Sequence, residues 1–382
     1  MATTEKWSGR IALMVAHCAG MVDLVALPVW VGTLISAYGF DPQQAGGLAT
    51  LFLVGAVVSS LFFAPRFNRI NPKLAAAAGF AIAGISFGIA SLQTGFGPMA
   101  VCHAVAGLAA GCALSFTHGS IGRSVNPHRL FAIVGLALGV FGIVVLGATP
   151  NLVAAFGGAA LFRLFAVVMV VAAVVAALFF PLLTGGRDQA SAVNGRLSRA
   201  VWAGIVGVSL MALNQSMVFS FFERIGADRG YGLAAVTGVL IALGFVNLIP
   251  GPLAAFLEKR LNPETVVRIG PIVQAVLALI ITLVIAFPAY AGAGAVFVSV
   301  MIFTHTFAFG LLARLDPSGR AVAATPAMLM VGAAIGPLLG GTLIKYSGYG
   351  AIGIAAVVVA VAAVMFFSQA RLSSAPVAQP AE

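Results

Sequence analysis

The sequence predicts an all-α membrane protein in which twelve transmembrane helices form two pseudo-symmetric six-helix bundles. Three observations lead to this prediction: the composition, the spacing of the charged residues, and a repeat of half the chain length. Of the 382 residues, 61% are hydrophobic and 8% are charged, and the mean hydropathy is +1.09. Soluble domains carry about a quarter charged residues. A water-soluble enzyme or nucleic-acid-binding protein is therefore disfavoured, despite the net charge of +10.

Charged residues divide the chain into segments of membrane-spanning length. No Asp, Glu, Lys or Arg lies within 74–122 or within 269–313. Each gap is about twice the ~20 residues that cross a bilayer. Each therefore predicts a helical hairpin, with turns at 93–98 and 288–292, where Gly and Pro break the pattern. The same reasoning along the whole chain predicts spans at 11–36, 46–64, 74–93, 98–122, 130–150, 158–183, 199–222, 233–256, 266–288, 291–313, 321–344 and 349–368.

The distribution of basic residues predicts the orientation of these spans. An even number of spans places both termini on one side of the membrane. If that side is cytoplasmic, four of the twenty basic residues lie outside, namely Arg163, Arg224, Arg229 and Lys345. Cytoplasmic loops carry an excess of Lys and Arg. With the Ala- and Gly-rich composition, this predicts a multi-pass protein of a bacterial inner (plasma) membrane with both termini cytoplasmic.

A repeat at an offset of 191 residues indicates two similar halves. The segment Arg69-Ile70-Asn71-Pro72 recurs as Arg260-Leu261-Asn262-Pro263, and Arg123 matches Arg314. Six spans followed by six more in the same topology predict two bundles related by an axis along the membrane normal. We therefore expect an N-terminal bundle over 1–183, a cytoplasmic linker over 184–198, a C-terminal bundle over 199–370 and a flexible tail over 371–382.

Three motifs can be read within these spans. The loop after the second span reads LFFAPRFNRI over 61–70 and resembles a G-x-L-A-D-R-x-G-R-R pattern, with a proline in place of the acid. The segment 103–111 is similar to R-x-x-Q-G-x-G-A-G, with histidine in place of arginine. The segment 332–341 matches G-x-x-x-G-P-x-x-G-G. With these motifs and the twelve-span repeat, the whole chain resembles the major facilitator superfamily. The glycine motif resembles one that the drug antiporters of that family carry in span 5, whereas here it lies in span 11.

The resemblance implies a secondary transporter with gating elements in two places. The first is the loop that contains Arg66 and Arg69. The second is span 11, because in that family spans 5 and 11 lie at contacts between the halves. Glycines also let helix backbones approach closely, so ordinary packing is the alternative for this stripe. The expected gating residues of span 11 are Gly332, Gly336, Pro337 and Gly340.

Asp23 is the one acid deep within a predicted span. It lies about 20 Å along a helix from Arg10, near the middle of the membrane. A charge buried in a bilayer is costly, so such an acid indicates a function. A carboxyl there can alternate between charged and neutral forms. We expect Asp23 to bind substrate or to couple transport to protons. The alternative is a protonated carboxyl that only forms a hydrogen bond with a neighbouring helix.

Other polar residues within the spans extend this candidate site. Asn214, the counterpart of Asp23 at the repeat offset, lies about 22 Å past Arg199 and is followed by Gln215. Polar residues at the same depth in both halves predict a central substrate site. The alternative is that these amide side chains only form hydrogen bonds between helices. The resemblance implies that His103 is the partner of Asp23 in proton coupling; the alternative is a hydrogen-bonded packing histidine.

Three further histidines lie nearer the cytoplasmic edge. His118 and His305 are expected to line the cavity and bind substrate, because spans 4 and 10 line it in the resembling family; a proton relay and plain packing are the alternatives. His17 is expected to face another helix. His17 also shares a helical stripe with soft side chains that would suit copper or zinc. Those side chains equally fill apolar gaps, so no metal site or cofactor is predicted. They are Met14, Cys18 and Met21.

These observations predict a secondary active transporter, not an enzyme. No Lys or Arg lies in the middle of a span, although a strongly anionic substrate would need a fixed cation. We expect proton-coupled efflux of a small neutral, cationic or amphipathic organic solute by alternating access, through a monomer in the lipid bilayer. The alternatives are an importer of a small organic nutrient such as a monocarboxylate and, less favoured, a transition-metal transporter. A membrane-embedded enzyme would need an acid, base or metal cluster that the short loops lack.

Overall fold

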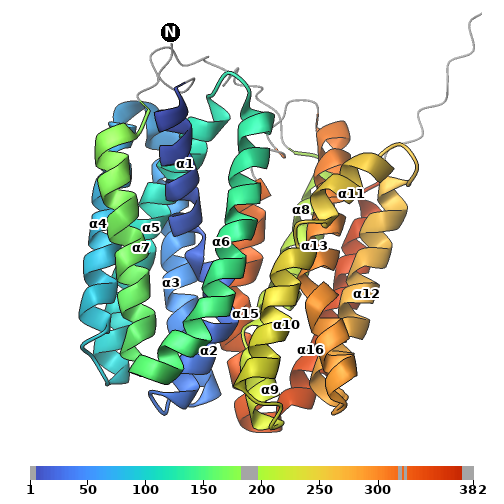
Figure 1. Cartoon of the computed structure of the whole chain (residues 1–382). Helices are drawn as coiled ribbons and strands as arrows, with labels where there is room; N and C mark the ends of the chain where they lie inside the picture. The colour runs from blue at the N-terminus through green and yellow to red at the C-terminus, as the bar shows by residue number, and fades with distance from the viewer. Residues whose placement is uncertain (1–5, 182–196, 317–320, 322–324, 372–382) are drawn as a thin grey trace, which may run out of the picture.

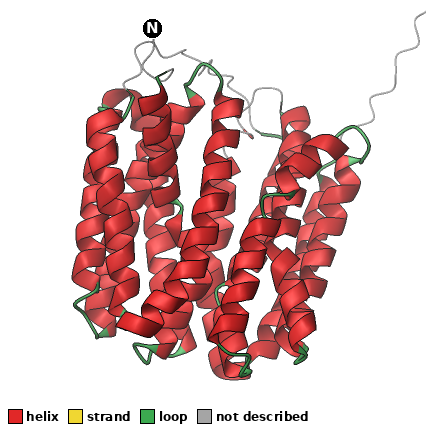
Figure 2. Cartoon of the chain, viewed as in Figure 1, coloured by secondary structure: helices red, strands yellow, loops and turns green. Residues whose placement is uncertain are grey.

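The structure, a computed structural model, describes residues 6–181, 197–316, 321 and 325–371. Within these residues all regular secondary structure is helical (Figure 2). Twelve helices or pairs of helices are long and apolar enough to cross a membrane, which confirms the predicted number of spans. Most of the predicted linker and tail, 184–198 and 371–382, lies outside the described residues, so their roles stay predictions.

The N-terminal half supplies six spans (Figure 1). Its first span is divided in two, and its second is extended by a short 3₁₀ helix. The elements are α1 (Trp7–Gly20) and α2 (Val22–Ser36), α3 (Pro42–Phe63) with η2 (Ala64–Arg69), α4 (Pro72–Ala90), α5 (Phe96–Gly122), α6 (Pro127–Phe156) and α7 (Ala159–Phe179).

The C-terminal half repeats this arrangement with six more spans (Figure 1). Its first and second spans are each divided in two. The elements are α8 (Arg199–Phe219) and α9 (Phe222–Asp228), α10 (Leu233–Val246) and α11 (Pro250–Leu257), α12 (Pro263–Leu283), α13 (Phe287–Leu315), α15 (Thr325–Ser347) and α16 (Tyr349–Gln369).

The repeated Asn-Pro dipeptide marks the start of equivalent helices. Asn71 precedes α4 and Asn262 precedes α12, and each side chain accepts hydrogen bonds from backbone N–H groups of the first turn. Pro72 and Pro263 follow, where a missing N–H costs nothing and the fixed φ suits a helix. The sequence repeat is therefore a repeat of helix starts.

Three predicted boundaries near prolines were wrong. The turn expected at 93–98 lies at 91–95, and Pro98 belongs to the first turn of α5. The turn expected at 288–292 lies at 284–286, and Pro288 belongs to the first turn of α13. The fifth span was expected to end at Pro150 but continues through it to Phe156. Proline is favourable in the first turn of a helix, and within membranes an interior proline is tolerated when neighbouring groups satisfy the freed carbonyl.

The two halves meet mainly along two pairs of helices. α3 packs against α15, and α6 packs against α10, while α2 makes smaller contacts with α8 and α9. We call the end of the bundle that carries Arg10, Lys73 and Arg260 the basic end, and the other, where α2 ends and α3 begins, the opposite end. In Figure 1 the basic end is at the top, and the helices of the two halves lie further apart there than at the bottom.

Candidate functional site

Asp23 lies where the first span is interrupted. α1 ends at Gly20, Met21 leaves the helical region with φ −110° and ψ 9°, and α2 begins at Val22. Asp23 is therefore in the first turn of α2, where free backbone N–H groups favour a negative group. Its side chain is 1% exposed, and its Oδ1 atom is buried with no hydrogen-bond partner. A buried acceptor without a donor is costly, so this carboxyl is not explained by packing alone.

The equivalent position of the C-terminal half is also polar and incompletely bonded. Asn214 is 1% exposed on α8, and its Nδ2 donates to Oε1 of Gln274 on α12 at 3.4 Å. The Oδ1 of Asn214 and the Oε1 of Gln215 are both buried without a partner. The hydrogen bond between the side-chain amides of Asn214 and Gln274 confirms an interhelical contact for Asn214. It leaves unpaired acceptors in both halves, on helices α2 and α8, which touch each other.

Gln274 is a polar residue of this region that sequence reasoning missed. It is fully buried, and its Nε2 donates to the Met211 carbonyl at 3.4 Å. The signal was present, because Gln274 lies inside the charge-free segment between Arg268 and Arg314. An uncharged amide in an apolar span deserved the same weight as Asn214.

The structure does not bring His103 to Asp23. The Nδ1 of His103 lies 2.6 Å from the Met99 carbonyl, and its Nε2 accepts a hydrogen bond from Trp30 Nε1 at 3.2 Å. Trp30 is seven residues beyond Asp23 on α2, which places it about 10 Å further along the same helix. His103 is fully buried beside Trp30 and a group of phenylalanines. The direct pairing inferred from the resemblance is therefore absent in this conformation.

His17 and His118 face each other across α1 and α5. Nδ1 of His17 lies 3.0 Å from Nε2 of His118, and the ring centroids are 5.1 Å apart. This agrees with the expectation that His17 faces another helix, and it gives His118 a protein partner. His305 packs against Phe309, and its Nδ1 is buried without a hydrogen-bond partner. In the described part of the chain no three His, Cys, Asp or Glu residues gather as metal ligands would.

The arginines of the predicted gating loop make local contacts. Arg66 donates to the Phe62 carbonyl at 2.6 Å and lies over the Phe62 ring at 3.8 Å. Neither Arg66 nor Arg69 forms an ion pair with any residue that the structure describes. The proline at position 65 explains this, because the acid that would pair with such an arginine is absent from this loop.

Three glycines expected at the contact between the halves lie elsewhere. A Cβ on Gly332 would lie 2.8 Å from the Ser209 carbonyl carbon, one on Gly336 2.6 Å from the Met217 nitrogen, and one on Gly340 2.9 Å from the Met217 oxygen. Ser209 and Met217 belong to α8 in the same half. This corrects the expectation: these glycines allow close packing inside the C-terminal half.

The contact between the halves at the opposite end, which we call the outer seam, is formed by residues 41–50, namely Asp41 and the start of α3, and by residues 337–345 of α15. A Cβ on Gly46 would lie 2.6 Å from the Pro337 carbonyl carbon, and one on Gly341 2.7 Å from that of Pro42. Leu338 N–H donates to Thr50 Oγ1 at 3.1 Å. The expected gating residue Pro337 therefore does lie between the halves, with its carbonyl against α3.

Polar side chains also join the halves at the outer seam. Lys345 Nζ lies 3.0 Å from Asp41 Oδ2 and 3.1 Å from Gln43 Oε1, while Gln43 Nε2 donates to Thr342 at 3.3 Å. Partial burial raises the pKa of Asp41, but the Gln44 N–H and the Lys345 ammonium outweigh it and hold that pKa below its ordinary value. Among the described residues, the hydrogen bonds and ion pairs that join the halves all involve this seam.

These features define a class of protein. Twelve apolar helices form two repeated bundles that are joined at one end, with unpaired polar atoms buried in both, as expected for a membrane transporter of the two-bundle type. The chain belongs to the Major Facilitator Superfamily, whose sequence profile matches residues 12–317. Membership of this family indicates a transporter, not an enzyme.

Two curated relatives are similar to the chain. One is the purine ribonucleoside efflux pump NepI of Shigella dysenteriae serotype 1 (strain Sd197), 24% identical over 289 residues, which cover 74% of this chain and 73% of the relative. The other is the 4-hydroxybenzoate transporter PcaK of Acinetobacter baylyi (strain ATCC 33305 / BD413 / ADP1), 34% identical over 77 residues, which cover 20% of this chain and 17% of the relative.

Two solved structures share the fold. The nucleoside transporter NupG has a TM-score of 0.71 and 12% identity, covering 96% of this chain and 98% of its own. The bacterial homologue of the human lysosomal transporter Spinster, in an inward-facing and unoccupied conformation, has a TM-score of 0.70 and 12% identity, covering 96% and 98%. At this identity the likeness shows the common fold alone.

Proposed function

We propose that this protein is a proton-coupled secondary transporter that exports a small neutral, cationic or amphipathic organic solute. The observation that carries the proposal is Asp23, a fully buried acid within a span whose Oδ1 has no donor. The unpaired oxygens of Asn214 and Gln215 support a central site shared by both halves. Together these acceptors suit a solute with N–H or O–H donors, or a proton.

A purine nucleoside is the first solute class to test. NepI, named as a purine ribonucleoside efflux pump, aligns with three-quarters of the chain and supports both this class and the direction of transport. Nucleosides are uncharged, which agrees with spans that lack Lys and Arg at their centres. Their base and ribose carry N–H and O–H groups that can donate to the unpaired oxygens of Asp23, Asn214 and Gln215.

Import of a small aromatic or other monocarboxylate is the second candidate. A short stretch of similarity to the 4-hydroxybenzoate transporter PcaK favours it. A carboxylate substrate, however, would have to approach Asp23 without a cation in the middle of any span. Such a substrate would bind only with a protonated Asp23.

Export can follow from the geometry in four steps. With the basic end facing the cytoplasm, as the distribution of Lys and Arg favours, the outer seam closes the external side and the site is open inward. Solute binds to the carboxylate of Asp23 and the amide oxygens of α8. The halves then rock, the outer seam separates, and a proton from outside binds to Asp23 and displaces the solute. The neutral carboxyl returns inward, where the proton is released.

His103 enters this scheme through Trp30. Its Nε2 accepts the indole N–H in the described conformation and so fixes the position of Trp30, two helical turns from Asp23. When the halves rock, a change at Asp23 would reach His103 through α2. His118 and His305 remain proposed cavity residues.

A binding screen tests the substrate class. Thermal stability of the purified protein is measured with adenosine, a cationic amphiphile such as tetraphenylphosphonium, 4-hydroxybenzoate and Zn²⁺. We expect adenosine or the amphiphile to raise the melting temperature, and Asp23→Asn to reduce that rise. Stabilisation by 4-hydroxybenzoate alone would favour the importer, and stabilisation by Zn²⁺ alone the metal transporter.

A further inference from the structure

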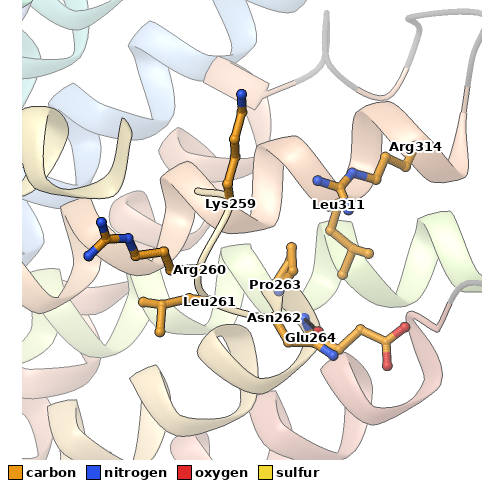
Figure 3. A pocket seen from close by; sticks show the side chains of 8 residues that line it. All are labelled: Lys259, Arg260, Leu261, Asn262, Pro263, Glu264, Leu311 and Arg314. Atoms are coloured by element: carbon orange, nitrogen blue, oxygen red, sulfur yellow. Dashed lines mark hydrogen bonds between the residues drawn. The ribbon is translucent and has the colours of Figure 1, made fainter. Parts of the chain in front are cut away.

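A hollow lined by cations lies at the basic end of the C-terminal half, between the loop that joins α11 to α12 and the end of α13 (Figure 3). Its volume is about 360 Å³. Three of its eight lining residues are basic and one is acidic. The lining residues are Lys259, Arg260, Leu261, Asn262, Pro263, Glu264, Leu311 and Arg314.

The cations of this hollow lack acceptors. Within the described ranges, the side chains of Lys259, Arg260 and Arg314 take part in no hydrogen bond or ion pair. The Arg260 guanidinium lies 5.0 Å from the Phe256 ring centroid, a contact that leaves its N–H groups free. Glu264, the acid of the hollow, lies 4.0 Å from Arg268 on its own helix. The hollow therefore presents an excess of hydrogen-bond donors and positive charge.

The N-terminal half shows how the same loop is satisfied without a ligand. There Arg123 donates to Asn68 Oδ1 at 3.4 Å and to the Gly119 carbonyl at 3.2 Å. At the repeat offset of 191 residues, Arg314 takes the place of Arg123, and Lys259 takes the place of Asn68. An acceptor in one half is thus a second cation in the other. Two cations that line one hollow repel each other, and an anion bound between them would offset this repulsion.

We propose that this hollow binds a phosphate group, either the headgroup of an anionic phospholipid or free inorganic phosphate. Arg and Lys are the side chains that bind phosphate oxygens, through charge-assisted hydrogen bonds. The hollow also lies at the ends of three membrane spans, where lipid headgroups lie when the helices cross a bilayer. Basic pockets between helix ends bind such headgroups in other membrane proteins. The proposal does not depend on the transport mechanism or on the solute carried.

Lipid retention measured by native mass spectrometry tests the proposal. The full chain is purified in detergent and mixed with phosphatidylglycerol or phosphatidylcholine, and its melting temperature is measured separately with inorganic phosphate. The test variant is Lys259→Gln/Arg314→Gln. The matched control is Asn68→Gln/Arg123→Gln, which changes the equivalent positions of the other half, where the arginine already has protein acceptors. Both variants alter exposed side chains, and their melting temperatures without ligand show whether they fold.

We expect the wild type to retain phosphatidylglycerol in preference to phosphatidylcholine. Each cation removed should weaken this binding about fivefold, so the test variant should bind about 25-fold more weakly, while the control keeps its preference. If only inorganic phosphate stabilises the wild type, and it does not stabilise the test variant, the proposed site is supported with free phosphate as its ligand. Equal loss of phosphatidylglycerol in test and control variants, or no selective binding of either ligand, would overturn the proposal.

Discussion

Adding one methyl group at Gly46 should open the outer seam. In the described conformation a Cβ at Gly46 would lie 2.6 Å from the Pro337 carbonyl carbon, which is backbone and cannot turn aside. Relief requires α3 and α15 to separate, so Gly46→Ala destabilises the state in which this end is closed. Overpacking of this kind costs about 1–3 kcal/mol. That energy corresponds to an increase of roughly 5- to 150-fold in the ratio of open to closed molecules.

Labelling of a cysteine in the seam measures this ratio. Thr50, whose hydroxyl accepts from Leu338 N–H across the seam, is replaced by Cys in a background where Cys18, Cys102 and Cys112 are Ala. A membrane-impermeant maleimide is added from the opposite end. Its reaction rate should rise with the open fraction and therefore increase 5- to 150-fold in Gly46→Ala.

Gly47 supplies the matched control. A Cβ there would meet only Leu338 Cδ1, at 3.8 Å, an ordinary van der Waals distance. Gly47→Ala carries the same change of propensity on the same helix, so it should label like the parent protein. If Gly46→Ala labelled no faster than Gly47→Ala, the close contact of α3 with α15 would not control access from this end.

Three further predictions concern the seam and the packing. Asp41→Asn should raise the same labelling rate about two- to fivefold, because a solvent-accessible ion pair with Lys345 contributes up to about 1 kcal/mol. Since the pKa of Asp41 is lowered, this contribution is present at neutral pH and is lost only as pH falls through that lowered value. An unchanged labelling rate would show that the ion pair does not hold the outer seam closed. Trp30→Phe should lower the melting temperature, because it leaves a buried imidazole nitrogen without its donor at a cost of about 1–3 kcal/mol; unchanged stability would contradict this. Gly107→Ala should destabilise the protein far more than Gly122→Ala, measured by thermal unfolding, because a Cβ at Gly107 would lie 2.7 Å from the Phe52 carbonyl carbon and one at Gly122 would meet nothing within 4 Å; equal melting temperatures would refute the packing of α3 on α5.

The fold was largely predictable from the sequence because charge is so scarce. Most of the thirty charged residues among 382 lie near the ends of the spans or in the predicted linker and tail. The repeat of Asn71-Pro72 at Asn262-Pro263 reflects equivalent helix caps. The division of the first span was not predictable, because no proline adjoins Met21. The division of the eighth span has a sequence signal that was missed, since Pro250-Gly251-Pro252 follows Asn247 where α11 begins.

The burial of the candidate site residues could be predicted from the sequence, but their neighbours could not. Counting residues places Asp23 and Asn214 inside their spans, and both are buried. Which neighbour each side chain meets could not be derived, because a helix that is apolar on all sides gives no hydrophobic face to orient it. His103 was therefore paired with the wrong partner, and its bond to Trp30 was missed. The same limit explains why Gly336 was expected between the halves and lies within one.

Gradient-driven transport in proteoliposomes tests the role of Asp23 most directly. Radiolabelled adenosine is supplied on the side of the membrane that the Lys- and Arg-rich end faces, and the other side is made more acidic. Solute exchange without a pH gradient is measured in the same preparation. We predict that Asp23→Asn abolishes accumulation but retains exchange, because the amide cannot take up a proton, and that Glu258→Gln, a change to an exposed acid, transports like the wild type. Continued accumulation by Asp23→Asn, driven by the pH gradient, would contradict the assignment of proton coupling to this residue.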